Sequence, residues 1–290
     1  MENLLHDFFN GNSQIINLAG NLATVMLVTA LICFVVSEIV RNYSQVDKLW
    51  SIMPVIYSII VLYNFPDSPR IWIMTILVAA WGLRLSLNFA RKGGYSRIPW
   101  RGEEDYRWEI MRRKPMLRGR IRFGIFNLLF ISLYQNILIL LFSTPLLVAA
   151  RYTDTPLSAA DIIAAILIIG ALIIETTADN QLFSFQQQKK GAAPHQDRFA
   201  RSLKNGFISD GLFSKSRHPN FAAEQAVWVF FYIFGASASG EWLNWSASGA
   251  ILLILLFIGS STLTERISSS KYPEYKEYQK RVPRFLPRLF

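Results

Sequence analysis

Long apolar blocks dominate this chain of 290 residues and decide what it can fold into. A helix that crosses the hydrocarbon core of a bilayer needs about 20 mostly apolar residues. Seven segments meet or approach this length. They are residues 18–40, 49–65, 71–89, 123–149, 159–178, 221–239 and 245–263. The sequence therefore predicts an all-α, polytopic membrane protein with about seven transmembrane helices.

The distribution of basic residues predicts which side of the membrane each end occupies. The chain has 30 Lys and Arg residues against 20 Asp and Glu residues, a formal net charge of +10. With the N-terminus outside and the C-terminus cytoplasmic, 27 of the 30 fall in cytoplasmic segments, mostly in 91–122, 180–220 and after 263. Lys and Arg are enriched in such segments. The charge therefore reflects topology and contact with membrane lipids, and we expect no nucleic-acid partner.

Several kinds of site are excluded by what the sequence lacks. Cys33 is the single cysteine, so the chain forms no internal disulfide. His6, His195 and His218 have no metal-ligand spacing, and we expect no metal site. No G-x-G-x-x-G, Walker or G-x-S-x-G motif occurs, so a bound nucleotide does not use a Rossmann domain. The sequence identifies no protein partner.

Polar side chains lie in or beside the predicted spans, where burial is costly and a functional role is common. The ionisable ones are Glu38, Asp47, Arg84, Glu175, Asp179, Glu224 and Glu265, and amides occur at Asn127, Gln135 and Asn136. All of these acids fall at predicted cytoplasmic ends, so they can line one cavity open to the cytosol. The alternative is that each side chain reaches the interface alone. The fourth segment is expected to break near Pro145.

The stretch 211–224 combines cationic donors with the start of a helix. Arg217 and His218 come just before Pro219, which suits the first turn of a helix. Helix N-terminal amides together with Arg make a good site for a phosphate or a carboxylate. Asn220 and Glu224 are four residues apart and share one helix face. An ordinary loop-to-helix entry is the alternative.

The stretch 271–287 alternates tyrosines with basic residues. Tyr272, Tyr275 and Tyr278 recur every three residues, and Lys and Arg surround them. One interpretation is an interfacial amphipathic helix with an aromatic edge. The other is a set of cationic and phenolic donors that closes over a nucleotide.

Further short motifs accompany these two stretches. They are Val46-Asp47-x-x-Trp50, Trp81-Gly-Leu-Arg84, Gly102-Glu-Glu-Asp105-Tyr-Arg107-Trp, Gln135, Asp179-Asn-Gln181, Ser216-Arg-His-Pro-Asn220 with Glu224, and Tyr275-x-x-Tyr278 ending in Pro283-Arg-Phe-Leu-Pro287. In this order, over residues 45–290, the chain resembles the steroid 5-alpha-reductase C-terminal family, and most closely its uncharacterised bacterial branch.

The resemblance implies an enzyme in one integral membrane domain. It implies that NADPH reduces a carbon–carbon double bond conjugated to a carbonyl in a lipid-soluble, possibly steroid-like substrate. Residues 18–149 would form the substrate side and 159–290 the cofactor-binding half. The positions that match cofactor-binding ones are Asp179, Arg217, His218, Asn220, Glu224, Arg266, Lys271 and Tyr275. The substrate would enter from the bilayer, in a bacterial inner membrane or an endoplasmic reticulum membrane.

The chain departs from the pattern of this family at three places. Phe221-Ala-Ala-Glu224 stands where the branch usually has Tyr-Phe-Gly-Glu, and Gln186 stands where it commonly has Lys. The Gln-Glu pair with which the steroid reductases polarise the substrate carbonyl is missing. Its role is assigned here to three other residues of the substrate side. They are Asp47, Tyr57 and Arg84.

Two other functions fit the same motifs. A membrane methyltransferase of the isoprenylcysteine carboxyl type has a similar Arg-His-Pro motif and a similar Tyr-rich tail, and it would bind S-adenosylmethionine. A non-catalytic lipid or sterol binder would keep the scaffold without the chemistry. The identity of the cofactor distinguishes the three, whereas no motif encodes the shape of the substrate pocket.

Overall fold

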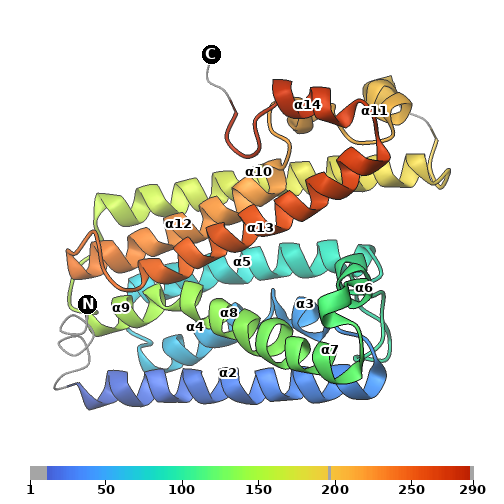
Figure 1. Cartoon of the computed structure of the whole chain (residues 1–290). Coiled ribbons are helices and arrows are strands. Elements are labelled where there is room, and N and C mark those ends of the chain that lie inside the picture. The colour runs from blue at the N-terminus through green and yellow to red at the C-terminus, as the bar shows by residue number, and fades with distance from the viewer. Residues whose placement is uncertain (1–11, 195–196, 288–290) are drawn as a thin grey trace. The chain divides into compact units, whose positions relative to one another are not determined.

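The computed structural model describes residues 12–194 and 197–287, and in these ranges every regular element is a helix. This confirms the predicted all-α class. In the same ranges, six helical segments are long and apolar enough to cross a membrane (Figure 1). They are α2 (Ser13–Val40), α5 (Pro69–Arg91), the run Arg120–Arg151, α10 (Ala159–Lys189), α12 (Pro219–Ser239) and α13 (Ala247–Lys271). The chain is an integral, multi-pass membrane protein; the side occupied by each terminus stays a prediction.

The second predicted segment, 49–65, does not form one long helix. The chain instead forms the short helix α3 (Gln45–Leu49), a turn at 50–52 and α4 (Met53–Asn64). At about 1.5 Å per residue, the 12 residues of α4 span about 18 Å, less than the hydrocarbon core of about 30 Å. Pro54 lies in the first turn of α4, where its missing N–H costs no hydrogen bond. Apolar composition does not reveal such an interruption.

The run Arg120–Arg151 consists of four consecutive helices. They are α7 (Arg120–Phe126), the π-helix η2 (Asn127–Tyr134), α8 (Gln135–Ser143) and α9 (Pro145–Arg151). The predicted break at Pro145 is confirmed, because α8 ends at Ser143 and α9 begins at the proline. Shorter helices connect the long ones. They are α6 (Tyr106–Arg113), η1 (Pro115–Leu117), η3 (Asp197–Phe199), α11 (Ala200–Asn205), η4 (Gly211–Ser214) and α14 (Tyr275–Arg281).

The chain divides into two compact units. Unit 1 consists of Met1–Ala165 and Phe231–Ala250, and unit 2 of Ile166–Phe230 and Ile251–Phe290. Within unit 1, α2, α4 and α8 pack against one another, and α4 also packs against α5. Gly82 permits this approach of α5, since a Cβ atom at position 82 would lie 2.6 Å from the backbone oxygen of Ser51. The close packing at this point therefore explains why the Trp81-Gly-Leu-Arg84 motif has glycine at position 82.

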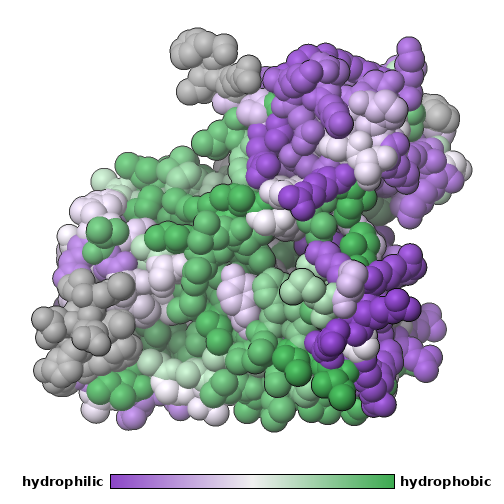
Figure 2. Space-filling model, viewed as in Figure 1, coloured by the Kyte–Doolittle hydropathy of each residue, from purple (hydrophilic) through white to green (hydrophobic). Residues whose placement is uncertain are grey.

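Two helices extend beyond their predicted ends in unit 2. α10 continues past residue 178 to Lys189, and α13 continues past residue 263 to Lys271. Asp179 and Glu265 therefore lie within helices and not after them. Figure 2 shows apolar residues over the long helices, and hydrophilic residues over α11 and α14 of unit 2 and over α6 of unit 1. This pattern suits helices that contact lipid along their length.

A buried ion pair joins the starts of α5 and α10 within unit 1. Arg70 and Asp161 are 2% and 1% exposed, and Nε and Nη2 of Arg70 each lie 3.0 Å from a carboxylate oxygen of Asp161. Arg70 also donates to two backbone carbonyls of the loop before α10. Asp161 accepts from the backbone N–H of Ser158 at 2.8 Å and from the hydroxyl of Ser237 at 3.1 Å. Both charges are thus fully partnered, as buried charges must be.

Candidate functional site

Four polar side chains on α10 and α12 form what we call the acceptor cluster: Glu175, Asp179, Asn220 and Glu224. The three carboxylates are buried. Asn220 Nδ2 donates to Asp179 Oδ1 at 3.3 Å, and Trp228 Nε1 donates to Glu224 Oε1 at 3.2 Å. α12 begins at Pro219, as predicted, and this places Asn220 and Glu224 on successive turns. The structure therefore brings Asp179 and Asn220 together, one helical turn from Glu224.

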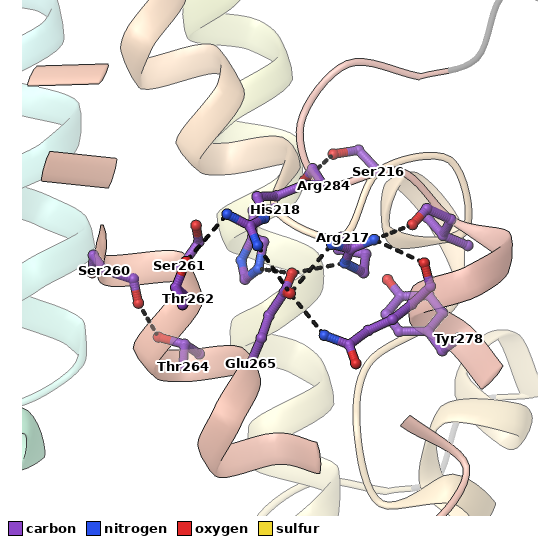
Figure 3. A network of polar contacts seen from close by, with 12 residues as sticks. Ser216, Arg217, His218, Ser260, Ser261, Thr262, Thr264, Glu265, Tyr278 and Arg284 are labelled. Atoms are coloured by element: carbon purple, nitrogen blue, oxygen red, sulfur yellow. Dashed lines mark hydrogen bonds and ion pairs between the residues drawn. The ribbon is translucent and has the colours of Figure 1, made fainter. Parts of the chain in front are cut away.

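Glu265 of α13 is the centre of a second group, the Glu265 network (Figure 3). Its carboxylate accepts hydrogen bonds from Arg217 Nε at 2.7 Å, Arg217 Nη2 at 3.2 Å and Gln279 Nε2 at 2.8 Å. His218 Nε2 lies 3.0 Å and Arg284 Nη2 lies 3.7 Å from it. Glu265 is 4% exposed and Arg217 10%. A buried carboxylate is thus matched by cationic groups from two distant parts of the chain.

Arg217 and His218, which the sequence predicts to bind an anion, hold the C-terminal tail, residues 279–284, by hydrogen bonds. The backbone N–H groups of Arg217 and His218 donate to the carbonyls of Pro283 and Arg284, at 2.9 and 3.0 Å. Arg217 Nη1 donates to two further carbonyls of the tail. These contacts occupy the guanidinium of Arg217 with partners from its own chain. A role of Arg217 and His218 as phosphate ligands therefore stays a prediction.

The residues that precede this tail divide into buried and accessible ones. Tyr275 and Tyr278 are buried against Phe207. Burial raises the pKa of Tyr275 to about 12, so this phenol stays neutral at physiological pH. Arg266 and Lys271 are exposed. Of the three residues predicted here to bind a cofactor, the two cations are open to solvent, whereas Tyr275 packs inside unit 2.

Asp47 of α3 is contacted by the start of α6. The side chain is half-buried, and Trp108 Nε1 donates to its Oδ2 at 3.0 Å. Burial raises the pKa of Asp47, although the nearby Arg107 opposes this. Arg107 is itself held by Asp105, with hydrogen bonds of 2.9 and 2.7 Å. Asp47 therefore keeps its proton to a higher pH than an exposed aspartate does.

The raised pKa of Asp47 predicts how the stability of the folded protein changes with pH. A carboxyl whose pKa is higher in the folded state stabilises that state most at low pH, and this contribution is lost as the pH rises through the folded pKa. We expect Asp47→Asn to have a higher melting temperature than the wild type at about pH 8 and the same one at about pH 4. Melting in detergent across this range checks it, with the exposed Asp67→Asn as control. A lower melting temperature of Asp47→Asn at about pH 8 would contradict it.

The other two candidates for polarising a substrate lie on separate helices. Tyr57 of α4 is fully buried, and its hydroxyl forms no hydrogen bond with any described residue. Arg84 is half-buried on α5. The thiol of Cys33 on α2 lies within electrostatic reach of both Asp47 and Tyr57. As the single cysteine of the chain, Cys33 was expected only to leave the chain without an internal disulfide.

An open pocket of about 440 Å³ lies in unit 1, between α2, α3 and the loop that follows α5. Its wall is mostly apolar and includes Cys33 and Lys48. Lys48 is 4% exposed and donates to Gln45 Oε1 at 3.3 Å and to the carbonyls of Pro99 and Arg101 at 3.3 and 3.0 Å. Burial lowers the pKa of Lys48. In the sequence, the one indication of this pocket is that Lys48 directly precedes the apolar segment 49–65.

The described residues contain no group of three or more His, Cys, Asp or Glu side chains that could hold a metal ion. His218 belongs to the Glu265 network. The two other histidines considered in the sequence, His6 and His195, lie outside the described residues.

The fold and these polar clusters define a membrane-embedded helical protein. More particularly, the chain belongs to the family described as "Protein of unknown function (DUF1295)", whose model matches residues 33–282. This range includes the acceptor cluster, Glu265 and the parts of the pocket wall that belong to α3 and to the loop after α5. The family description assigns no activity.

Two relatives are similar to this chain. "Uncharacterized protein C594.04c" of Schizosaccharomyces pombe is 38% identical over 266 residues, which are 88% of this chain and 75% of that protein. "Cobalt-zinc-cadmium resistance protein CzcN" of Cupriavidus metallidurans is 31% identical over 85 residues, which are 29% of this chain and 37% of that protein. No solved structure matches the chain.

Proposed function

We propose that this protein is a membrane reductase that uses NADPH to saturate a carbon–carbon double bond conjugated to a carbonyl in a lipid-soluble substrate. The motifs that resemble the steroid 5-alpha-reductase C-terminal family support this activity. The observation that carries it is the acceptor cluster of unit 2. Bound NADPH supplies a hydride, so the chain has to hold the nucleotide, orient the substrate and deliver a proton.

The acceptor cluster suits the parts of a nucleotide that donate hydrogen bonds. Ribose hydroxyls, the adenine amino group and the nicotinamide carboxamide all present such donors. Asp179 and Glu224 offer carboxylate oxygens, and Asn220 offers both an acceptor and donors. Buried carboxylates in a membrane helix are costly and commonly functional. We therefore assign these three residues, with Glu175, to the non-phosphate groups.

The phosphates of NADPH need accessible cations. Arg217 and His218 are balanced by Glu265, so they contribute little positive charge to a ligand. Arg266 and Lys271, near the end of α13, are exposed and fit this role. The residues present thus match both kinds of group that NADPH carries.

The proton that completes the reduction needs a donor. A hydride adds to the β-carbon of the enone, and a proton adds to the α-carbon through the enol. Asp47 is the best supported donor, because its raised pKa keeps it protonated at higher pH than usual. Tyr57 and Arg84 remain candidates for polarising the carbonyl.

A specific observation favours a second candidate, a methyltransferase that binds S-adenosylmethionine. The acceptor cluster contributes three carboxylates from α10 and α12, and the motif arginine Arg217 is paired with Glu265. Carboxylates attract a cationic sulfonium more readily than a polyanionic nucleotide. The same titration distinguishes the two candidates.

The test is ligand-dependent thermal stability of the purified full-length protein in detergent. NADPH at a hundred times its Kd would stabilise the protein by about 2.7 kcal/mol. We expect NADPH to raise the melting temperature, and Glu224→Ala to weaken its binding by about tenfold or more because a buried charged acceptor is lost. Glu224→Gln should weaken it less.

The matched control is Glu241→Gln, at an exposed position outside the acceptor cluster, which should leave binding unchanged. Stabilisation by S-adenosylmethionine and not by NADPH would replace the reductase with the methyltransferase. A response to neither would leave a non-catalytic lipid binder. Unchanged NADPH binding by Glu224→Ala would refute the assignment of the cluster.

A further inference from the structure

Three helices of unit 1 meet around a small group of buried polar side chains. α2 contributes Cys33, α4 contributes Tyr57 and α8 contributes Asn136, and these helices pack against one another. Tyr57 and Asn136 are fully buried, and Cys33 is 1% exposed. The hydroxyl of Tyr57 and the Oδ1 atom of Asn136 have no hydrogen-bond partner among the described residues. Two orphaned polar atoms on helices that pack against each other are unusual, because burial without a hydrogen bond is unfavourable.

The amide of Asn136 is held in one orientation. Its Nδ2 donates to the backbone oxygen of Ser132 at 2.7 Å, one turn earlier, in the π-helix η2. The carbonyl end of the amide is therefore the end left to a ligand. The thiol of Cys33 lies within hydrogen-bonding reach of Asn136 and interacts electrostatically with Tyr57. A thiol is a weak donor and does not satisfy an amide oxygen well.

Cys33 also connects this group to the open pocket, because it forms part of the pocket wall. The pocket volume of about 440 Å³ is in the usual range for a small-molecule site. The other wall residues are largely apolar, among them Ile32, Val36 and Trp100. The body of a ligand in this pocket is therefore apolar. Tyr57 and Asn136 do not line the pocket themselves, so Cys33 is the wall residue past which the polar end of the ligand has to reach them.

Donors and acceptors select the chemistry of that polar end. The oxygen Oδ1 of Asn136 can only accept, so the ligand has to donate; the hydroxyl of Tyr57 can donate, so the ligand oxygen can accept. An alcohol does both with one atom, whereas a ketone leaves Asn136 unsatisfied and a hydrocarbon satisfies neither. A carboxylate is not favoured, since the three donors of Lys48 are already bound within the protein.

We infer that unit 1 binds the hydroxyl group of a lipid alcohol between Tyr57 and Asn136, with Cys33 as the contact at the pocket wall. The inference does not depend on the reductase proposal, because it concerns binding and not turnover. Cys33 is the single cysteine of the chain, so its labelling reports on this wall alone.

The experiment measures the rate at which N-ethylmaleimide labels Cys33 in the full-length protein in detergent, by intact mass. The probes are 1-tetradecanol, 2-tetradecanone and tetradecane, which share one chain length and differ in the polar end. We expect the alcohol to slow labelling at about tenfold lower concentration than the alkane, and the ketone to lie between them. Tyr57→Phe and Asn136→Leu should each reduce the advantage of the alcohol while protection by the alkane persists.

The matched control is Ser143→Ala, which removes a buried hydroxyl on the same helix that is already bonded to Ile139 O at 2.8 Å. This variant should keep the advantage of the alcohol. The comparison of alcohol and alkane in the wild type tests the inference even when a variant fails to fold. Equal protection by the two probes, or a Cys33 that N-ethylmaleimide does not label in the ligand-free protein, would overturn it. Binding of NADPH is measured separately, so either proposal can fail alone.

Discussion

Replacing Arg70 with methionine is expected to destabilise the protein by about 3–5 kcal/mol, because it leaves the carboxylate of Asp161 buried without its cation. Both side chains are almost completely buried, and the guanidinium makes two hydrogen bonds of 3.0 Å to the carboxylate. The carboxylate also accepts from Ser158 and Ser237. Loss of the arginine therefore weakens contacts within unit 1. These contacts connect α5 with the first turn of α10 and, through Ser237, with the last turn of α12.

Unfolding of the variant in mixed micelles measures this loss. The matched control is Arg91→Met, at the exposed end of the same helix, where Arg91 Nε donates to Asn88 Oδ1 at 2.9 Å. It should cost less than about 1 kcal/mol. The double variant Arg70→Met with Asp161→Leu should recover most of the stability, since no charge is then left unpaired. Equal losses for Arg70→Met and Arg91→Met would contradict the expectation.

Replacing Glu265 with glutamine is expected to release the C-terminal tail. Glutamine removes the charge that balances Arg217, and its NH₂ group faces the donors of Gln279 or Arg217 where an acceptor stood. Arg217 is 10% exposed, so its charge is left largely buried and unpaired. We expect a loss of about 3 kcal/mol or more, concentrated in the contacts of loop 216–218 with the tail.

Limited proteolysis with trypsin measures the release directly, because Lys280 and Arg281 are exposed on α14 and need only local opening to be cut. Cleavage there should be at least about tenfold faster in Glu265→Gln than in the wild type. The matched control is Glu277→Gln, whose side chain is 63% exposed and pairs with Lys280 on the same helix. Its effect should be small, as for most surface ion pairs. Equal cleavage of both variants would show that Glu265 does not hold the tail.

Local patterns were enough to predict most of the long helices of this protein. The apolar blocks identified the long helices, because the requirement to span a bilayer acts on consecutive residues. Pro145 and Pro219 marked a helix break and a helix start, since the missing N–H of proline acts within one turn. Short-range patterns failed at residues 49–65, where the apolar composition runs through the turn between α3 and α4. Spacing of four also placed Asn220 and Glu224 on one helix face.

Only the tertiary structure decided which side chains meet. Glu265 was recognised as an acid at the end of a span, but its partners Arg217 and Gln279 come from a distant loop and from the tail. The pairing of Arg70 with Asp161 spans 91 positions, and neither residue has a local signal for the other. Asn136 was noted as a deep amide, yet its closeness to Cys33 depends on how α2 and α8 pack.

The sequence by itself determined the class of this protein, a helical chain that crosses the membrane several times, because hydrophobic length and charge distribution act along the chain. It also marked the residues whose burial in a membrane needs explaining. Which of them pair with each other, which hold the tail and which are left for a ligand depended on contacts between helices. Such contacts are set by the packing of whole faces, and no short stretch of sequence encodes them.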